Sequence, residues 1–326
     1  MKKIIVFFVL TSILTNSCID QLDVNTDRGE FILVIEGFIS TQPSPHVISI
    51  TKSVKYGSAF VDGVIRRIRG AKVFIRDQRG EITFLTEFGF GFYLTPAGFR
   101  AVVGNSYTLQ IITGGMTYYS TPELVTKAPE IDSLILKFKK FPSTDPLDFV
   151  SGVEVYSQWR DPEDETNYYM WESSGTYRID NCWIFDPNGD NKSIRIMKDK
   201  NSNGNLVTDL AAFIEDDGGR YMDKYYITVQ QLSISEEAYL FFKLLDNQLS
   251  IDGDIFDPPP ATIRGNMISL ENPNETVIGY FLAADVSVKS IFITKEILGD
   301  KQILKVINDD CRVLLNSSTQ PPPFWD

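Results

Sequence analysis

A run of oxygen-bearing side chains between residues 199 and 209 has the spacing of a calcium-binding loop. Asp199, Asn201 and Asn203 stand at relative positions 1, 3 and 5, Gly204 follows at position 6, and position 8 is aliphatic. In such loops the alternating oxygens surround the ion and the glycine permits the sharp turn. Position 12 is Leu210, where the closing glutamate belongs. The sequence therefore matches only the first two-thirds of the motif.

A turn between two strands explains the same residues without a metal. Asn203-Gly204 is a common reversal, and strand-like residues precede and follow it. The turn is the favoured interpretation, and calcium is the alternative. The ligands under that alternative are Asp199, Asn201, Asn203, Asn205 and Asp209. Apart from calcium, no cofactor is expected.

Aromatic residues in two later stretches offer surfaces on which a sugar or a peptide can stack. Strand aromatics also commonly pack in a core on one face and are partly exposed on the other, and core packing is the favoured interpretation. The candidate contacts for a ligand or partner are Tyr168, Tyr169, Trp171, Tyr280 and Phe281.

Catalytic motifs are sparse. The single histidine, His46, excludes every mechanism that needs two imidazoles, and no Gly-x-Ser-x-Gly nucleophile motif occurs. We expect His46 at the surface and assign no catalytic residue. A hydrolase that uses two carboxylates stays an alternative, because the fold alone brings such a pair together. The net charge of −12 opposes nucleic-acid binding.

The N-terminus has the pattern of a bacterial lipoprotein signal. Lys2 and Lys3 precede an apolar run over residues 4–10, and Ser17 stands directly before Cys18. The run is too short to cross a bilayer. We expect residues 1–17 to be a cleaved signal peptide and Cys18 to carry the lipid, including palmitate. Residues 18–29 form an acidic tether that resembles the one by which Bacteroidota lipoproteins are exported to the outer face of the outer membrane, and a solvated linker is the alternative.

Two cysteines remain after the anchor, Cys182 and Cys311. Export places them in an oxidising compartment, where two remaining cysteines usually form a disulfide. A disulfide is the favoured interpretation, and two buried free thiols are the alternative.

The rest of the chain predicts a mainly β protein. Short β-branched and aromatic runs separated by turns predict an Ig-like or prealbumin-like antiparallel sandwich over residues 30–129. A second antiparallel β-rich domain is expected over residues 130–315, followed by a Pro-rich tail over 316–326. One helix is expected over residues 238–249, with Ser233 and Glu236 as a capping box, and should pack on a sheet face.

Several stretches, each weak alone, follow one another in a recognisable order: Cys18 with its acidic tether, then residues 34–39, 70–73, 104–109, 129–133, 159–162, 167–169, 265–267 and 277–281. Together they resemble Bacteroidota outer-membrane lipoproteins catalogued as a domain of unknown function and typically encoded beside TonB-dependent receptors. The resemblance implies a TonB-dependent outer-membrane receptor as partner and brings no catalytic residues.

The expected function is that of a cell-surface, lipid-anchored accessory to a TonB-dependent transporter, without catalysis, that captures a ligand or caps the receptor. A structural or adhesive envelope component is one alternative, and the carboxylate-dependent hydrolase is the other.

Overall fold

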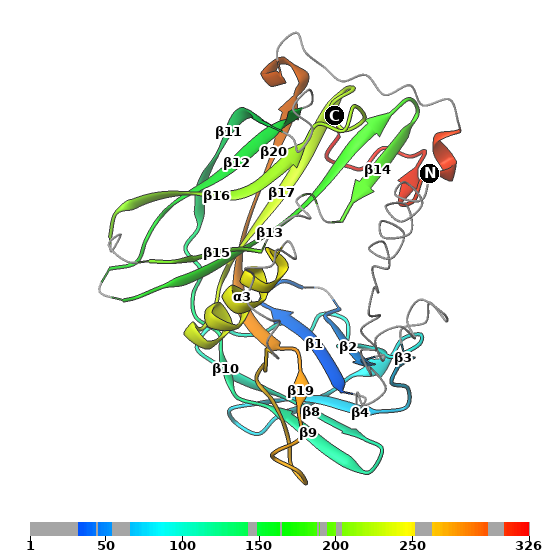
Figure 1. The fold of residues 1–326 in the computed structure, drawn as a ribbon, viewed down its shortest axis with the longest axis vertical. Coiled ribbons are helices and arrows are strands. Elements are labelled where there is room, and N and C mark those ends of the chain that lie inside the picture. Colours follow the sequence, from blue (N-terminus) through cyan, green and yellow to red (C-terminus); the bar gives the residue numbers. More distant parts are fainter. Residues whose placement is uncertain are drawn as a thin grey trace, which may run out of the picture.

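The computed structural model describes residues 32–43, 45–53, 66–142, 149–163, 165–187, 189, 194–199, 204–251, 263–298 and 310–325. The signal peptide, Cys18, Asn201 and Asn203 lie outside these residues. The protein is mainly β, with three sheets and a packed helix, as predicted (Figure 1).

The largest sheet runs through both halves of the molecule. In spatial order its main path is β21 (Ser317–Ser318), β14 (Cys182–Asp186), β13 (Tyr168–Ile179), β17 (Lys224–Ser233), β20 (Phe281–Thr294), β1 (Leu33–Ser40), β2 (Val47–Lys52), β7 (Phe92–Leu94) and β6 (Thr86–Glu87). Beside this path lie β15 (Arg195–Lys198), β19 (Val277–Ile278) and β3 (Arg66–Arg67).

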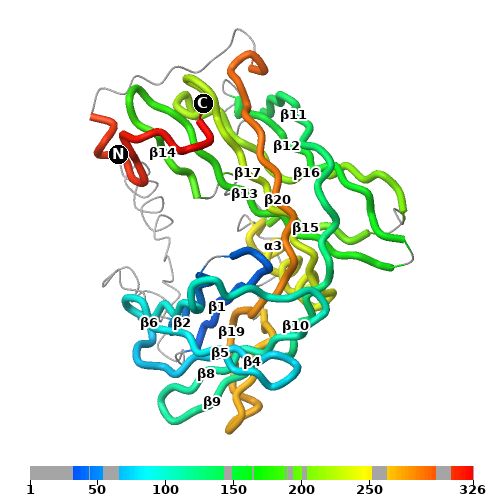
Figure 2. The backbone as a smooth tube through the Cα atoms, turned by 180° about the vertical axis from the view of Figure 1, so that it is seen from behind, coloured from blue at the N-terminus to red at the C-terminus, as the bar shows by residue number. Residues whose placement is uncertain are grey.

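Strand β20 joins the two halves. Its first residues, Phe281 to Ala284, pair in parallel with β1, and the rest, from Asp285 to Thr294, pair antiparallel with β17. Figure 2 follows β20 as one continuous orange segment from the N-terminal sheets to the C-terminal ones. Hydrogen bonding is therefore continuous between the halves.

The N-terminal half is a sandwich. Its second sheet contains β18 (Met267–Ser269), β9 (Met116–Ser120), β8 (Ser106–Thr113), β4 (Lys72–Asp77) and β5 (Ile82–Phe84), with β10 (Glu123–Leu124) beside β8. Alternation in β8 turns Tyr107, Leu109 and Ile111 inward, where they share a core with residues of β1 and β2.

A late part of the chain completes this sandwich. β18 pairs with β9, and β19 pairs in parallel with β1. The division expected at residue 129 assigned this segment to the C-terminal domain, whereas its side chains Met267 and Val277 lie in the N-terminal core. A single domain boundary at residue 129 cannot describe this fold, because a later segment of the chain packs in the N-terminal core.

The C-terminal half has a third sheet, with β11 (Ile131–Pro142), β12 (Phe149–Arg160) and β16 (Leu206–Glu215). Its inward residues, among them Val153, Val155 and Trp159, pack against β13 and β17. These three residues have the period-2 spacing of a half-buried strand.

Helix α3 (Glu236–Leu249) packs against the large sheet, and Ser235 is its N-cap, whose side chain accepts from the Ala238 amide at 3.1 Å. The prediction of Ser233 as the N-cap is wrong, because Ser233 still pairs with Asp285 in the sheet. Nowhere in the described part of the chain is a helix both long and apolar enough to span a membrane.

The C-terminal segment is tied to the second half. Cys182 and Cys311 form the predicted disulfide at the start of the short 3-10 helix η2 (Cys311–Val313). Another 3-10 helix, η1 (Lys295–Leu298), follows β20. The Pro-rich tail packs on the protein, since Trp325 is buried and the Phe324 ring stacks on Tyr226 at 4.1 Å.

Candidate functional site

A groove of about 960 Å³ is lined by residues of α3 and of the large sheet. Figure 1 shows α3 at the junction of the two halves of the molecule. Its walls come from β1, β2, β13, β15 and α3. Its lining includes polar, aromatic and aliphatic side chains, among them Glu36, Phe38, Glu172, Arg195, Phe241, Phe242, Leu245, Leu249 and Tyr280. A volume of this size suits a ligand larger than a single amino acid.

One wall of the groove is aromatic and aliphatic. Phe241, Phe242, Leu245 and Leu249 recur at the spacing that places side chains on one helix face. The Phe241 ring lies 5.0 Å from the Tyr280 ring, and Phe242 lies 6.0 Å from it. Because Leu249 is 68% exposed, this wall presents apolar surface to solvent.

The opposite wall carries a carboxylate without a cationic partner among the described residues. Glu172 of β13 is exposed to solvent and also lines the groove. Desolvation by the groove walls raises the pKa of Glu172. Glu36 is a second, exposed carboxylate, and Arg195 is a basic group on the same groove. A site of this kind favours a ligand with an apolar body and a positive group.

The five predicted aromatic contacts are all buried: Tyr168, Tyr169, Trp171, Tyr280 and Phe281 are each less than 9% exposed. Both faces of β13 are covered, one by the third sheet and the other by α3. Trp171 and Tyr280 border the groove, whereas the other three are core residues. Sequence reasoning missed Glu172 and the α3 side chains, although the helical spacing of Phe241, Leu245 and Leu249 carried a signal.

Of the five ligands in the calcium alternative, Asn201 and Asn203 lie outside the described residues, and the structure places Asp199 and Asp209 in different surroundings. Asp209 lies on β16, where Ser157 is its strand partner and its side chain accepts from the Leu210 amide at 2.8 Å. Burial raises the pKa of Asp209, and nearby Arg195 opposes the shift. Asp199 is buried beside Asp161 instead. Within the described residues, no group of three or more His, Cys, Asp or Glu side chains is placed to hold a metal.

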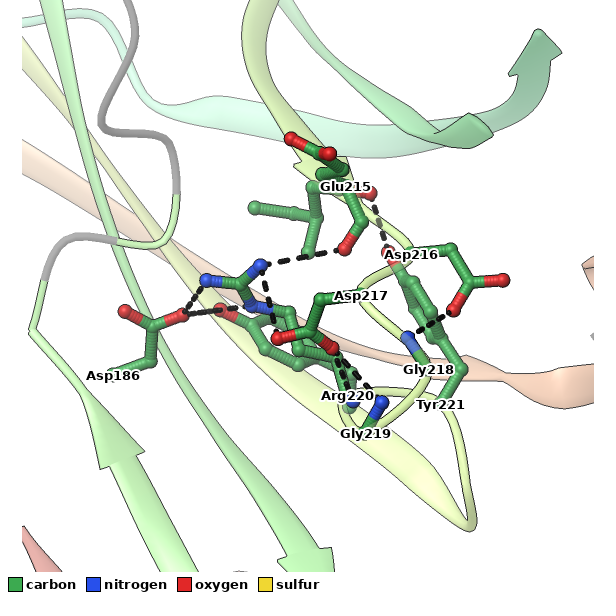
Figure 3. A network of polar contacts seen from close by, with 10 residues as sticks. Asp186, Glu215, Asp216, Asp217, Gly218, Gly219, Arg220 and Tyr221 are labelled. Atoms are coloured by element: carbon green, nitrogen blue, oxygen red, sulfur yellow. Dashed lines mark hydrogen bonds and ion pairs between the residues drawn. The ribbon is translucent and has the colours of Figure 1, made fainter. Parts of the chain in front are cut away.

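A network of acidic residues around Arg220 closes the turn between β16 and β17 (Figure 3). Arg220 donates from Nε to Asp186 at 3.1 Å and lies 3.6 Å from Asp217. Asp217 accepts from two turn amides, and Tyr225 donates its hydroxyl to Asp186 at 3.2 Å. Arg220 supplies one positive charge against two carboxylates, and the turn amides and the Tyr225 hydroxyl add hydrogen bonds, an arrangement typical of a structural site.

His46 was expected at the surface, and this is wrong because its side chain is only 5% exposed. The ring packs edge-on against Phe99 at 5.9 Å, and burial lowers its pKa.

The chain belongs to a family described as "Domain of unknown function (DUF4249)", whose profile matches residues 19–290. The match includes strands from both halves and the wall residues of the groove. No curated protein matches the sequence.

Proposed function

We propose that this protein is a cell-surface outer-membrane lipoprotein, without catalytic activity, that captures a ligand for a TonB-dependent transporter. The groove is the observation that carries the proposal. Its apolar α3 wall and the Glu172 carboxylate complement a basic, amphipathic ligand.

The location and the partner rest on the sequence. The basic pair Lys2-Lys3, the apolar run and Ser17-Cys18 support lipidation at Cys18. The order of the stretches quoted above supports a receptor partner by resemblance to lipoproteins encoded beside such receptors. The acidic tether supports the external face.

The partner is tested by purifying the tagged full-length protein from detergent-solubilised outer membrane, with mass spectrometry of what accompanies it. A TonB-dependent barrel in stoichiometric yield supports the accessory role. A protein that purifies alone, or with envelope assembly proteins, overturns it. Labelling with a palmitate analogue should mark the wild type and spare Cys18→Ser.

The groove is tested with Nile red, a neutral dye whose fluorescence rises in apolar surroundings. Leu249→Glu adds a charge to the groove wall and should weaken dye binding about 10-fold. Leu244→Glu is the matched control, because Leu244 lies on the same helix, is 55% exposed and is not among the groove residues. Equal effects of the two variants would contradict the groove assignment.

The charge preference is tested with a short amphipathic peptide that carries one lysine. Glu172→Gln keeps the shape of the side chain and removes its charge, so the peptide should bind less tightly while Nile red is unaffected. An unchanged peptide affinity would contradict the role of Glu172.

A further inference from the structure

A second cavity, of about 340 Å³, is lined by the C-terminal half of the large sheet and by the C-terminal segment. Its volume is at the lower end of the range for small-molecule sites. Strand β17 turns Tyr225 and Ile227 toward the third sheet and Tyr226 and Thr228 toward the cavity. The cavity is therefore on the sheet face that the third sheet leaves uncovered. Figure 2 shows the C-terminal segment, in red, beside β14.

Aromatic rings line this cavity, and two of them are open to solvent. Phe185 of β14 is 49% exposed, and Phe324 of the C-terminal segment is 41% exposed. The Phe324 ring stacks on Tyr226 at 4.1 Å, and the rings of Trp183 and Trp325 meet edge-on at 6.3 Å. These contacts hold the rings in place before a ligand binds, which lowers the entropy lost on binding.

Polar groups of the cavity have hydrogen-bonding capacity that the protein does not use. Thr176 is 7% exposed, and its hydroxyl makes no hydrogen bond with any described residue. Nε1 of Trp183 is buried and has no acceptor in the described part of the chain. A buried donor without an acceptor is unfavourable, and a ligand that accepts from it removes that penalty. Ser174, Asn316 and Gln320 add a hydroxyl and two amides to the lining.

The lining is uncharged, since its described residues include no Asp, Glu, Lys, Arg or His. The next cations along β17 and β13 are engaged: Lys224 donates to the Trp325 carbonyl at 2.6 Å, and Arg178 pairs with Asp223 at 3.1 Å. A charged ligand would lose hydration here without gaining a counter-charge. A wholly apolar ligand would leave the polar groups of the lining unpaired. The cavity therefore favours a neutral ligand that has both hydroxyl groups and an apolar face.

We propose that this cavity binds a neutral carbohydrate. A sugar ring has a face of C–H groups that packs on an aromatic side chain, and its hydroxyl groups both donate and accept hydrogen bonds. Phe185 and Phe324 supply the exposed rings, and Thr176 and Trp183 supply the unused polar groups. The inference goes beyond the proposed function, because the cavity shares no lining residue with the groove beside α3.

Isothermal titration calorimetry with defined sugars tests the site. The probes are cellotriose, maltotriose, xylotriose, mannotriose and chitotriose, with trigalacturonate as the anionic comparison. The full-length protein is kept in a detergent without a sugar headgroup, because such headgroups would compete. At least one neutral trisaccharide should bind with a Kd of about 1 mM or tighter, and trigalacturonate should bind more weakly. Absence of binding by every neutral probe, or a preference for trigalacturonate, would overturn the proposal.

Two cavity variants locate the bound sugar. Thr176→Val keeps the shape of the side chain and should weaken binding about 10-fold, without lowering the melting temperature, because the hydroxyl has no partner in the described protein. Phe185→Ala should weaken binding to a similar extent and keeps the test decisive if Thr176→Val folds poorly, since Phe185 is half exposed.

Thr108→Val is the matched control, because Thr108 lies on β8 and lines neither the cavity nor the groove. It should bind the sugar as the wild type does, and so should Leu249→Glu in the groove. Unchanged affinity in both cavity variants, or an equal loss in Thr108→Val, contradicts the site. A loss confined to Leu249→Glu would place the sugar in the groove and also overturn the inference.

Discussion

The two ends of β16 carry acidic clusters whose carboxylates have different partners. At the end near Glu215, Arg220 lies against Asp186 and Asp217, and each of these carboxylates has a donor. At the end near Leu206, one oxygen of Asp161 and one of Asn167 have no hydrogen-bond donor among the residues that the structure describes. A strand of 10 residues places the clusters about 30 Å apart, so each acts alone.

This difference shows that a cluster of acidic side chains within the fold does not by itself define a binding site. Where Arg220 lies against Asp186 and Asp217, the carboxylates stabilise a turn. At the Leu206 end, Tyr169 donates a hydrogen bond to Asp161, and no described cation pairs with that carboxyl. Substituting one partner at a time separates the contributions of the Arg220 cluster and the Asp161 cluster.

The largest effect is expected at Arg220. Arg220→Ala leaves Asp186 and Asp217 without their cation, and the free energy of unfolding should fall by about 3 kcal/mol. Because the Arg220 side chain is 20% exposed, the expected loss in free energy of unfolding lies at the lower end of the range for a buried ion pair. Urea denaturation measures it. Arg178→Ala is the control, since its ion pair with Asp223 is exposed and should contribute less than about 1 kcal/mol. Equal losses in Arg220→Ala and Arg178→Ala would show that the Arg220 network stabilises the fold no more than an exposed ion pair does.

A second self-neutralised carboxylate, Asp285, should give a pH-dependent effect. Burial alone would raise its pKa, but hydrogen bonds from Thr41 and Ala128, together with Lys127, lower it. Asp285→Asn should reduce the free energy of unfolding by about 2 kcal/mol at neutral pH.

Because the folded-state pKa of Asp285 is lowered, its stabilisation is present above the unfolded-state pKa of about 3.9 and is lost as pH falls through the folded-state pKa. The difference between variant and wild type should therefore shrink in acid, as followed by denaturation at several pH values. A difference that grows in acid would contradict the assignment.

The smallest effects compare one tyrosine from each cluster. Tyr169→Phe removes the hydrogen bond to Asp161 and should reduce stability by about 1.5 kcal/mol. Tyr225→Phe should reduce it by only about 0.5 kcal/mol, because Arg220 still donates to Asp186. Thermal unfolding of both variants checks the order, and the reverse order would mean that the clusters do not differ as described.

Local patterns predicted much of the fold. Alternation identified β8 and the inward face of β12, and the two remaining cysteines indicated their own disulfide. The pairing of β20 with β1 was not predictable, because it joins strands more than 200 residues apart in parallel. The Ser233 cap failed for a related reason, since long-range pairing with Asp285 keeps that residue in the sheet.

The sites were less predictable than the fold. Spacing along one segment drew attention to Asp199 but paired it with Asp209, whereas the tertiary neighbour is Asp161. The aromatic residues of β13 looked like surfaces for a ligand because sequence does not reveal how many faces of a strand are covered. Contacts between segments distant in sequence determine both the neighbour of Asp199 and the burial of the β13 aromatic residues.

The place of β1 has a mechanical consequence. The strand starts at Leu33, soon after the described chain begins, and is held by β2 on one edge and by β19 and β20 on the other. A pull on the N-terminus directed along β1 would load these hydrogen bonds in shear, together, and not peel them off one by one. If Cys18 is fixed in a membrane, the fold therefore bears tension at the strand that also ties its two halves together.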